Sequence, residues 1–173
     1  MALIASLVVG SNGATSLAGN SRPLSTPSDR ERFLKRHRSA SAFIIGKKSA
    51  ILESYAATDV PILVFSRNSD ALNLPHPLMQ QVTVNRGDLG EISRRIDQRI
   101  EGEIVVEAGV SLLTALINAG VIDQWELSIS PIEGDGDFID YETLLLKFDV
   151  SEEVAADGTR LLQCRYKGDS PNS

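Results

Sequence analysis

The sequence predicts an α/β fold with a mixed, mainly parallel sheet, helices on both faces and an antiparallel hairpin at the C-terminal edge. Three observations support this prediction. Short apolar runs rich in β-branched residues alternate with segments of helical period along most of the chain. The stretch at 103–120 changes from one period to the other within a few residues. Near the C-terminus an Asp-Gly turn lies between two alternating runs, which is typical of a hairpin.

Composition limits the classes of protein that the chain can belong to. The 173 residues carry a formal net charge of −6, so a broad basic face for nucleic acid is not expected. One cysteine, Cys164, excludes a disulfide framework, and with only two histidines we expect no metal site. No apolar run approaches the roughly 20 residues of a membrane span. We therefore expect a single cytoplasmic domain over residues 1–173, without a membrane partner and with a frayed tail at 168–173.

The N-terminal segment predicts a central strand followed by a long loop. Residues 2–9 are almost entirely apolar, as a buried strand should be. Residues 10–25 are rich in glycine and small polar residues, and loops of this length are often lids or binding loops. The pair Asn12 and Gly13 is also compatible with a plain turn.

A helix is predicted next, with Thr26 as its N-cap and Pro27 at its first position. It extends to about residue 38 and is dense in lysine and arginine. This basic surface is either an ordinary solvated face or a source of cations for an anionic ligand.

Two further strands end in residues that suit phosphate binding. The strand at 40–45 is followed by Gly46, Lys47, Lys48 and Ser49, and the strand at 61–65 by Ser66 and Arg67. Each corner alone could be an ordinary turn. Because ligands of open α/β sheets collect at the carboxyl ends of strands, the repetition favours a binding site.

The clearest unit is at 103–120. Residues 104–106 predict a strand buried on both faces, Gly109 lies in the turn, and a helix follows from about residue 110 until Gly120 stops it. The free N–H groups at the start of such a helix attract anions. A strand, a glycine turn and a helix together form a candidate phosphate cradle, although any βα unit with a glycine turn shows the same pattern.

The remaining segments complete the sheet. A short strand is expected at 81–84, and Asp88 is predicted to cap an amphipathic helix that continues through Ile100. Alternation at 121–130 predicts a half-buried strand with Trp125 on its apolar side, and 133–137 is expected to be a turn. Residues 144–154 and 159–166 would then pair as the hairpin.

Several of these segments also occur, in the same order, in a known family. They are SNGAT at 11–15, GNS at 19–21, TPSDR at 26–30, IIGKKS at 44–49, EAGVSLL at 107–113, AGVID at 119–123 and ISP at 129–131. In this spacing they resemble the dihydrofolate-reductase-like family, typified by the C-terminal reductase half of the bifunctional riboflavin-biosynthesis deaminase/reductase. The resemblance implies a three-layer dihydrofolate-reductase-like fold and covers the chain to about residue 136.

The resemblance also implies a function. It suggests an NADPH-dependent oxidoreductase, similar to 5-amino-6-(5-phosphoribosylamino)uracil reductase, that passes a hydride to a small heterocyclic or ribosylamino-pyrimidine-like substrate. Family members are commonly homodimers, and Trp125 with the C-terminal hairpin offers an apolar edge. The implied cofactor residues are Gly46, Lys47, Lys48, Ser49, Ser66, Arg67, Ala108, Gly109, Val110, Ser111, Leu112 and Leu113. The implied substrate residues are Asn12, Ser21, His37, Arg38 and Glu107.

The chain departs from the family at several of these positions. The aspartate of the first loop is Asn12, the Gly-Gly pair is Ala108 and Gly109, and the arginine that meets the substrate phosphate aligns with His37. The family's D-D-P-x-L-x-x-R segment after Ser49 is absent. NADPH binding is therefore better supported than the riboflavin substrate, and no residue is assigned as catalytic. The alternatives are an NADP(H)-binding module with lost or altered activity and a structural α/β domain.

Overall fold

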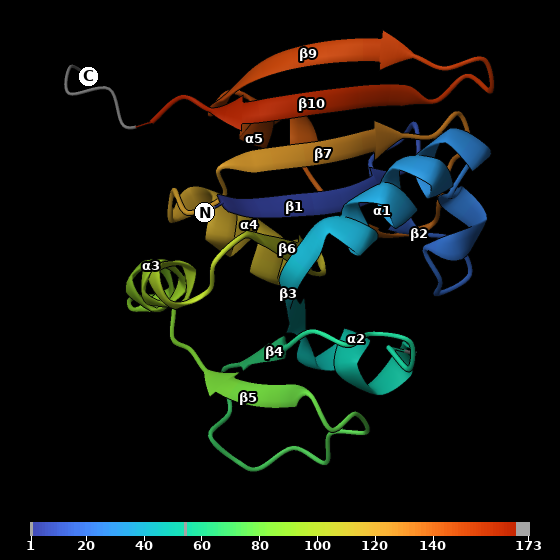
Figure 1. Ribbon diagram of the computed structural model, residues 1–173. Coiled ribbons are helices and arrows are strands. Elements are labelled where there is room, and N and C mark those ends of the chain that lie inside the picture. The colour runs from blue at the N-terminus through green and yellow to red at the C-terminus, as the bar shows by residue number, and fades with distance from the viewer. Residues whose placement is uncertain (1, 54, 169–173) are drawn as a thin grey trace.

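An eight-stranded sheet forms the centre of the computed structural model, which describes residues 2–53 and 55–168 (Figure 1). Its strand order is β5-β4-β3-β6-β1-β7-β10-β9. The strands from β5 to β7 run parallel, whereas β10 is antiparallel to both of its neighbours. The predicted mixed sheet with a C-terminal hairpin at one edge is confirmed. The strands are β1 (Ala2–Val9), β3 (Ala40–Gly46), β4 (Ile62–Ser66), β5 (Met79–Thr83), β6 (Glu103–Glu107), β7 (Gln124–Ile129), β9 (Phe148–Val154) and β10 (Arg160–Tyr166).

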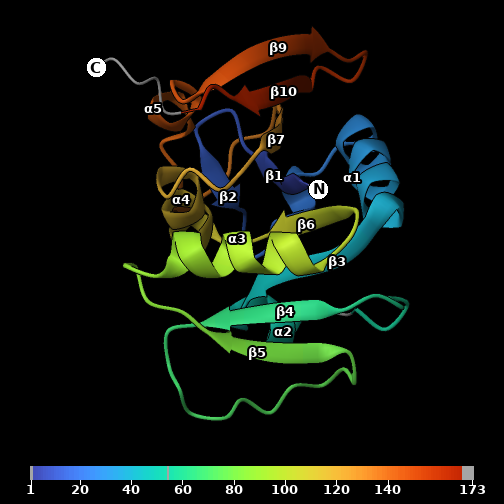
Figure 2. The ribbon, with the colours of Figure 1, turned by 60° about the vertical axis from the view of Figure 1, so that its left-hand side comes forward.

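Helices cover both faces of this sheet, so the three-layer prediction also holds. Figure 2 shows α3 (Leu89–Arg99) and α4 (Val110–Asn118) on one side and α1 (Pro27–Ser39) on the other. Successive residues of β3 pack into different layers: Ile44 belongs to the α4 side of the core, and Phe43 and Ile45 belong to a second cluster with Ala50 of α2 (Lys47–Leu52). This alternation is what a strand buried on both faces requires.

The contact between α1 and the sheet is largely polar. Arg36 forms ion pairs with Glu126 of β7 and with Glu103 of β6, the latter at 2.7 Å. Arg32 donates to Ser128 Oγ at 2.9 Å and to the Leu162 carbonyl at 3.0 Å. Arg32 and Arg36 of the basic helix are therefore occupied by contacts with residues of the sheet. They are neither purely solvated nor left for a ligand.

The prediction of a half-buried strand at 121–130 was therefore wrong. In β7 the polar residues Glu126 and Ser128 are 5% and 1% exposed, and Trp125 is fully buried. β7 lies between β1 and β10 rather than at an edge of the sheet. Arg32 and Arg36 of α1 cover the face of β7 that carries Ser128 and Glu126. Trp125 packs against Phe148 at 5.8 Å between ring centroids, so it does not form the apolar edge that we expected.

Two predicted loops contain short strands. Residues 10–25 include β2 (Ala14–Ser16) and the 3₁₀ helix η1 (Arg22–Leu24), and the expected turn at 133–137 leads into β8 (Gly136–Phe138), which pairs with β2. The carboxylate of Asp135 also accepts from the backbone N–H of Ala18 at 3.0 Å. Strands this short carry no hydrophobic period, so the sequence pattern could not reveal them.

The start of the C-terminal hairpin also differs from the prediction. Residues 144 and 145 belong to the helix α5 (Tyr141–Leu145), and β9 begins only at Phe148. Helix α3 ends at Arg99, and the side chain of its N-cap residue, Asp88, makes no capping hydrogen bond. Of the predicted frayed tail only Gly168 lies within the described residues. None of the described helices is long and apolar enough to cross a membrane.

Candidate functional site

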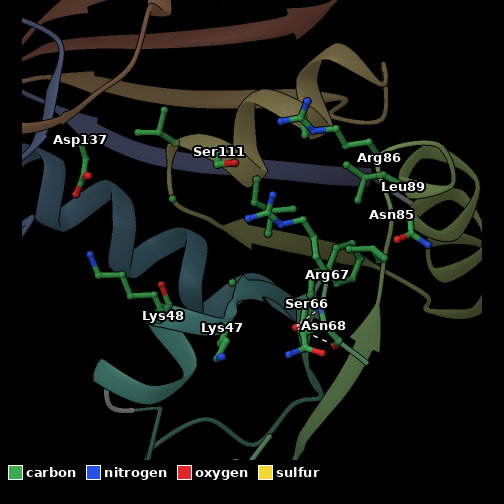
Figure 3. A pocket seen from close by; sticks show the side chains of 18 of the residues that line it. Lys47, Lys48, Ser66, Arg67, Asn68, Asn85, Arg86, Leu89, Ser111 and Asp137 are labelled. Carbon is green, nitrogen blue, oxygen red and sulfur yellow. Dashed lines mark hydrogen bonds between the residues drawn. The ribbon is translucent and has the colours of Figure 1, made fainter. Parts of the chain in front are cut away.

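A cleft of about 790 Å³ opens where β3, β4 and β6 end and where α4 begins (Figure 3). Parallel strands bring their carboxyl ends to one edge of the sheet, so corners that are far apart in sequence meet there. The β2 and β8 pair supplies a further wall through Thr15, Asp137 and Phe138. The cleft is therefore built from the strand ends that the sequence singled out, together with the small second sheet.

The floor of this cleft is apolar and its rim is cationic. Phe65, Val84 and Leu89 are each less than 5% exposed and form part of the lining. The rim carries Lys47, Lys48, Arg67 and Arg86, and Asp137 is the acid among the lining residues. Within residues 2–53 and 55–168, none of these four cations makes an ion pair. In a chain of net charge −6, such a concentration of unpaired positive charge favours an anionic ligand.

The start of α4 adds backbone donors to the same cleft. Gly109 is its N-cap, and no side chain caps the helix. The N–H groups of Val110 and Ser111 therefore remain for a ligand, at the end of the helix that attracts negative charge. Gly109 has φ −66° and ψ 172°, which any residue adopts, and an added Cβ would have nothing within 4 Å. The turn does not need glycine for its conformation, so glycine here leaves space for close approach.

The predicted cofactor residues do not all lie in the cleft. Ala108 and Leu113 are 7% and 0% exposed and belong to the core. Ser66 lines the cleft, but its hydroxyl is bonded within its own turn, where it accepts from Asn68 N and donates to Asn68 O, both at 3.2 Å. The other predicted cofactor residues line the cleft: Gly46, Lys47, Lys48, Ser49, Arg67, Gly109, Val110, Ser111 and Leu112.

The predicted substrate residues divide into two groups. Glu107 lies on the α1 side of the sheet, where its Oε1 is 3.0 Å from His37 Nε2 and its Oε2 accepts from the hydroxyl of Tyr55 at 3.1 Å. His37 and Arg38 line a second cavity of about 390 Å³ together with Tyr55. Glu107 and His37 are thus in contact, and Arg38 is beside them.

Asn12 and Ser21 lie apart from that group. Asn12 Nδ2 donates to the Gly134 carbonyl at 2.9 Å, and its Oδ1 accepts from Gly134 N at 3.1 Å. These bonds tie the first loop to the segment before β8. Ser21 is exposed at the start of η1 and its side chain makes no capping bond. Neither residue lines the large cleft or the smaller cavity.

Two acidic groups beside Glu107 are stabilised in their neutral forms. Burial, followed by the charges of Glu107 and Glu53, raises the pKa of the Tyr55 phenol far above its ordinary value. Burial and the charge of Glu107 also raise the pKa of Glu53. Tyr55 therefore remains a neutral phenol near neutral pH, and its hydroxyl donates a hydrogen bond to Glu107 Oε2.

Removing the Tyr55 hydroxyl tests how much its hydrogen bond to Glu107 contributes to stability. We expect Tyr55→Phe to lower the free energy of unfolding by about 1–3 kcal/mol, because Glu107 Oε2 would lose its hydrogen bond in a poorly solvated site. Urea unfolding of the variant and the wild type measures the difference. An unchanged midpoint and slope would show that water replaces the phenol without cost.

Sequence reasoning missed several residues of the site. Asn85, Arg86 and Leu89 follow β5 and line the large cleft. Arg86 follows a strand in the same way as Arg67, so the pattern used at Ser66 and Arg67 could have found it. Phe138 and Tyr55 carried no comparable signal, because the segments around them have no period.

Comparison with known proteins identifies the fold. No protein-family model matches the sequence, and no curated protein does. Among solved structures, dihydrofolate reductase from Enterococcus faecalis in complex with NADP(H) superposes with a TM-score of 0.66 at 16% identity, over 96% of both chains. The chain has the dihydrofolate-reductase fold.

Two further solved structures are also similar to this chain. A candidate riboflavin biosynthesis protein from Shewanella sp. PV-4 has a TM-score of 0.72 at 15% identity, over 96% of this chain and 99% of that one. The diaminohydroxyphosphoribosylaminopyrimidine deaminase/5-amino-6-(5-phosphoribosylamino)uracil reductase of Thermotoga maritima has a TM-score of 0.69 at 15% identity. That match covers 95% of this chain but only 56% of the bifunctional protein. These likenesses confirm the fold that the sequence motifs predicted.

Proposed function

We propose that this protein is an NADPH-dependent reductase of the riboflavin-biosynthesis or dihydrofolate-reductase type, acting on a small heterocyclic or ribosylamino-pyrimidine-like substrate. The observation that carries the proposal is the large cleft, with unpaired cations on its rim and the uncapped start of α4 beside Gly109. Support also comes from the fold, since a neighbour with the same fold was solved with NADP(H).

The residues of the cleft fit this cofactor. NADPH carries a diphosphate and a separate phosphomonoester, and the rim offers lysines and arginines together with free backbone N–H groups. Its rings need apolar surface, which Phe65, Val84 and Leu89 provide. A cleft of about 790 Å³ also lies within the range of roughly 300–1,000 Å³ that is usual for ligand pockets.

In this proposal the protein binds and orients, and the bound NADPH supplies the hydride. Lys47 and Lys48 would neutralise phosphate charge, and the N–H groups at the start of α4 would hold the diphosphate. Glu107, fixed by Tyr55 and His37, would accept an N–H from the substrate ring. Asp137 is the carboxyl group among the described lining residues of the large cleft. Its position relative to a reacting atom is not defined, so we assign no catalytic acid.

A cofactor-binding module without turnover is the second candidate. It is favoured by Asn12, which is committed to the Gly134 backbone and has no carboxyl group to support proton chemistry. Such a module would bind NADPH but would not oxidise it with any substrate. The homodimer, the cytoplasmic location and the place in riboflavin biosynthesis stay predictions.

Binding of NADPH is the first test of either function. At about 1 mM cofactor, a site with a Kd of ~10 μM adds about 2.7 kcal/mol of stability. For a domain of this size we expect the melting temperature to rise by about 5–10 °C. NADH is the control and should give a smaller shift. No shift with NADPH at this concentration would refute both functions, whereas a shift would justify a turnover screen with pterins and the riboflavin pyrimidine intermediate.

A further inference from the structure

We infer that the carboxylate of Asp137 stabilises the positively charged nicotinamide ring of NADP⁺, and so favours the oxidised cofactor over the reduced one. This inference rests on the proposed function and concerns a residue that the sequence motifs do not assign. Asp137 is the acid among the lining residues of a cleft whose rim carries four cations. A negative charge in such a cleft suits a part of the ligand that is not a phosphate.

The strand order separates Asp137 from the cations that suit phosphate. Arg67 and Arg86 follow β4 and β5, at one edge of the sheet, and Gly109 follows β6, which lies between β3 and β1. Asp137 belongs to β8, which pairs with β2, and β2 follows β1 in the chain and contacts it. Along the sheet the cleft therefore has the arginines at one end, the start of α4 in the middle and Asp137 at the other end. Figure 3 shows the same order.

The Asp137 carboxylate is free, whereas its backbone is held in place. Thr15 Oγ1 donates to the Asp137 carbonyl at 2.6 Å, and Ala14 of β2 is paired with Phe138. In the part of the chain that the structure describes, the carboxylate makes neither an ion pair nor a hydrogen bond. Figure 3 shows Lys48 pointing toward it from the other wall of the cleft, without an ion pair between them. The small second sheet thus fixes a negative charge that a ligand can reach.

The same end of the cleft offers an aromatic surface. Phe138 is 58% exposed and lines the cleft. An exposed phenylalanine beside a carboxylate suits a flat ring that carries positive charge, because the ring packs on the aromatic side chain while the carboxylate balances the charge. In the cofactor the phosphomonoester, the diphosphate and the nicotinamide follow one another in this order. With the phosphates at the arginines and at the start of α4, the nicotinamide ring reaches the end that carries Asp137.

The two forms of the cofactor differ in charge at this ring. Their phosphates are the same, but the nicotinamide ring is a cation in NADP⁺ and is neutral in NADPH. Loss of a hydride, which is two electrons and one proton, from NADPH to an acceptor leaves that positive charge on the ring. A fixed carboxylate at this end of the cleft stabilises the charge as it develops. Tighter binding of the oxidised form therefore makes the bound NADPH a stronger hydride donor.

The test replaces Asp137 by its uncharged isostere. Asp137→Asn keeps the shape of the side chain, and asparagine tolerates the φ of 51° at this position. Asp149→Asn is the control, because Asp149 is an exposed acid of β9 outside the lining of the cleft. Calorimetric titration at low salt gives the Kd of NADP⁺ and of NADPH for each protein, and the ratio of the two constants is the readout. We expect Asp137→Asn to weaken NADP⁺ relative to NADPH by about threefold to tenfold, as for a charge pair in a partly solvated cleft. Asp149→Asn should leave the ratio unchanged.

The outcomes separate this inference from the function on which it rests. If the wild type binds both forms and Asp137→Asn keeps the same ratio, the inference is overturned and the proposed function stands. An equal change in both affinities would assign the carboxylate to the shared phosphates or to a contact with Lys48, and would also overturn it. The same shift in Asp149→Asn would show an effect of net charge and would overturn it as well. Failure of the wild type to bind NADPH would refute the proposed function itself, and this inference with it.

Discussion

Gly109→Val is expected to lower the affinity for NADPH by about a hundredfold or more without unfolding the protein. The backbone of Gly109 has φ −66° and ψ 172°, so valine can adopt it, and an added Cβ would meet no atom within 4 Å. Loss of glycine also reduces the freedom of the unfolded chain, which stabilises the folded protein by about 0.4–1 kcal/mol when the conformation suits the new residue. We expect the branched side chain of valine to occupy the space next to the free N–H groups at the start of α4, and so to block the cofactor's diphosphate.

The measurement pairs calorimetric titration of NADPH with urea unfolding of the same variant. Gly87→Val is the matched control, because Gly87 also has open space at its Cβ position and lies outside the lining of the cleft. It should retain both stability and affinity. Undiminished NADPH binding by Gly109→Val would remove the start of α4 from the proposed cofactor site, whereas unfolding would show that the turn needs glycine after all.

Such a variant separates binding from folding, which most glycine changes in this chain cannot do. At Gly102 the φ of +103° and the Ser41 Oγ at 2.2 Å from an added Cβ make any substitution strained. Gly134 would bring a Cβ to 2.4 Å from the Ser16 carbonyl oxygen. These glycines are required by the fold, and Gly109 is not. The open space at Gly109 is therefore compatible with a ligand that approaches its backbone, as the proposed function requires.

The sequence was informative wherever a local period reported a whole element. The change of period at 103–120 predicted β6, the turn and α4, and the Asp-Gly turn at 157–158 predicted the hairpin. Because parallel strands present their carboxyl ends at one edge, the rule that ligands collect there brought Gly46, Arg67 and Gly109 into one predicted site. All three line the observed cleft.

The features that the sequence did not predict depend on contacts between segments that are far apart in the chain. That β5 lies next to β4, and so places Arg86 beside Arg67, is a matter of strand order that no local pattern contains. The partner of Glu107 in the loop after α2 is Tyr55, which has no periodic context. The cations of α1 show the same limit, because a basic helix has the same sequence whether its arginines meet water or buried carboxylates.

The largest effect on stability is expected for Arg36→Met. The Arg36 side chain is 19% exposed and bridges Glu103 and Glu126, of which Glu126 is 5% exposed. Glu126 Oε2 has no hydrogen-bond partner among the described residues. Arg36 makes the ion pair with the other oxygen, Oε1, and Arg32 interacts with Glu126 through its charge without an ion pair. Removing one member of a buried ion pair typically costs about 3–5 kcal/mol, because the other charge stays buried without a partner. Urea unfolding at neutral pH should show a loss of this size, while Arg38→Met, at an exposed position of the same helix, should change stability by less than about 0.5 kcal/mol.

A second substitution, at Glu126, shows whether Arg36→Met loses stability because a charge stays buried without a partner or because side-chain packing is lost. If the unpaired Glu126 causes the loss, Arg36→Met combined with Glu126→Leu should regain most of the stability, since an apolar pair of similar volume often replaces a buried ion pair without cost.

Hydrogen bonds from Ser39, and then Arg36, lower the pKa of Glu103 below its ordinary value. The ionised Glu103 therefore contributes to the free energy of unfolding above its pKa in the unfolded chain, about 4.3. This contribution is lost as the pH falls through the lower pKa of the folded protein. The wild type should lose more stability than Arg36→Met over that acid range, and parallel pH profiles would show that Arg36 does not stabilise the Glu103 carboxylate.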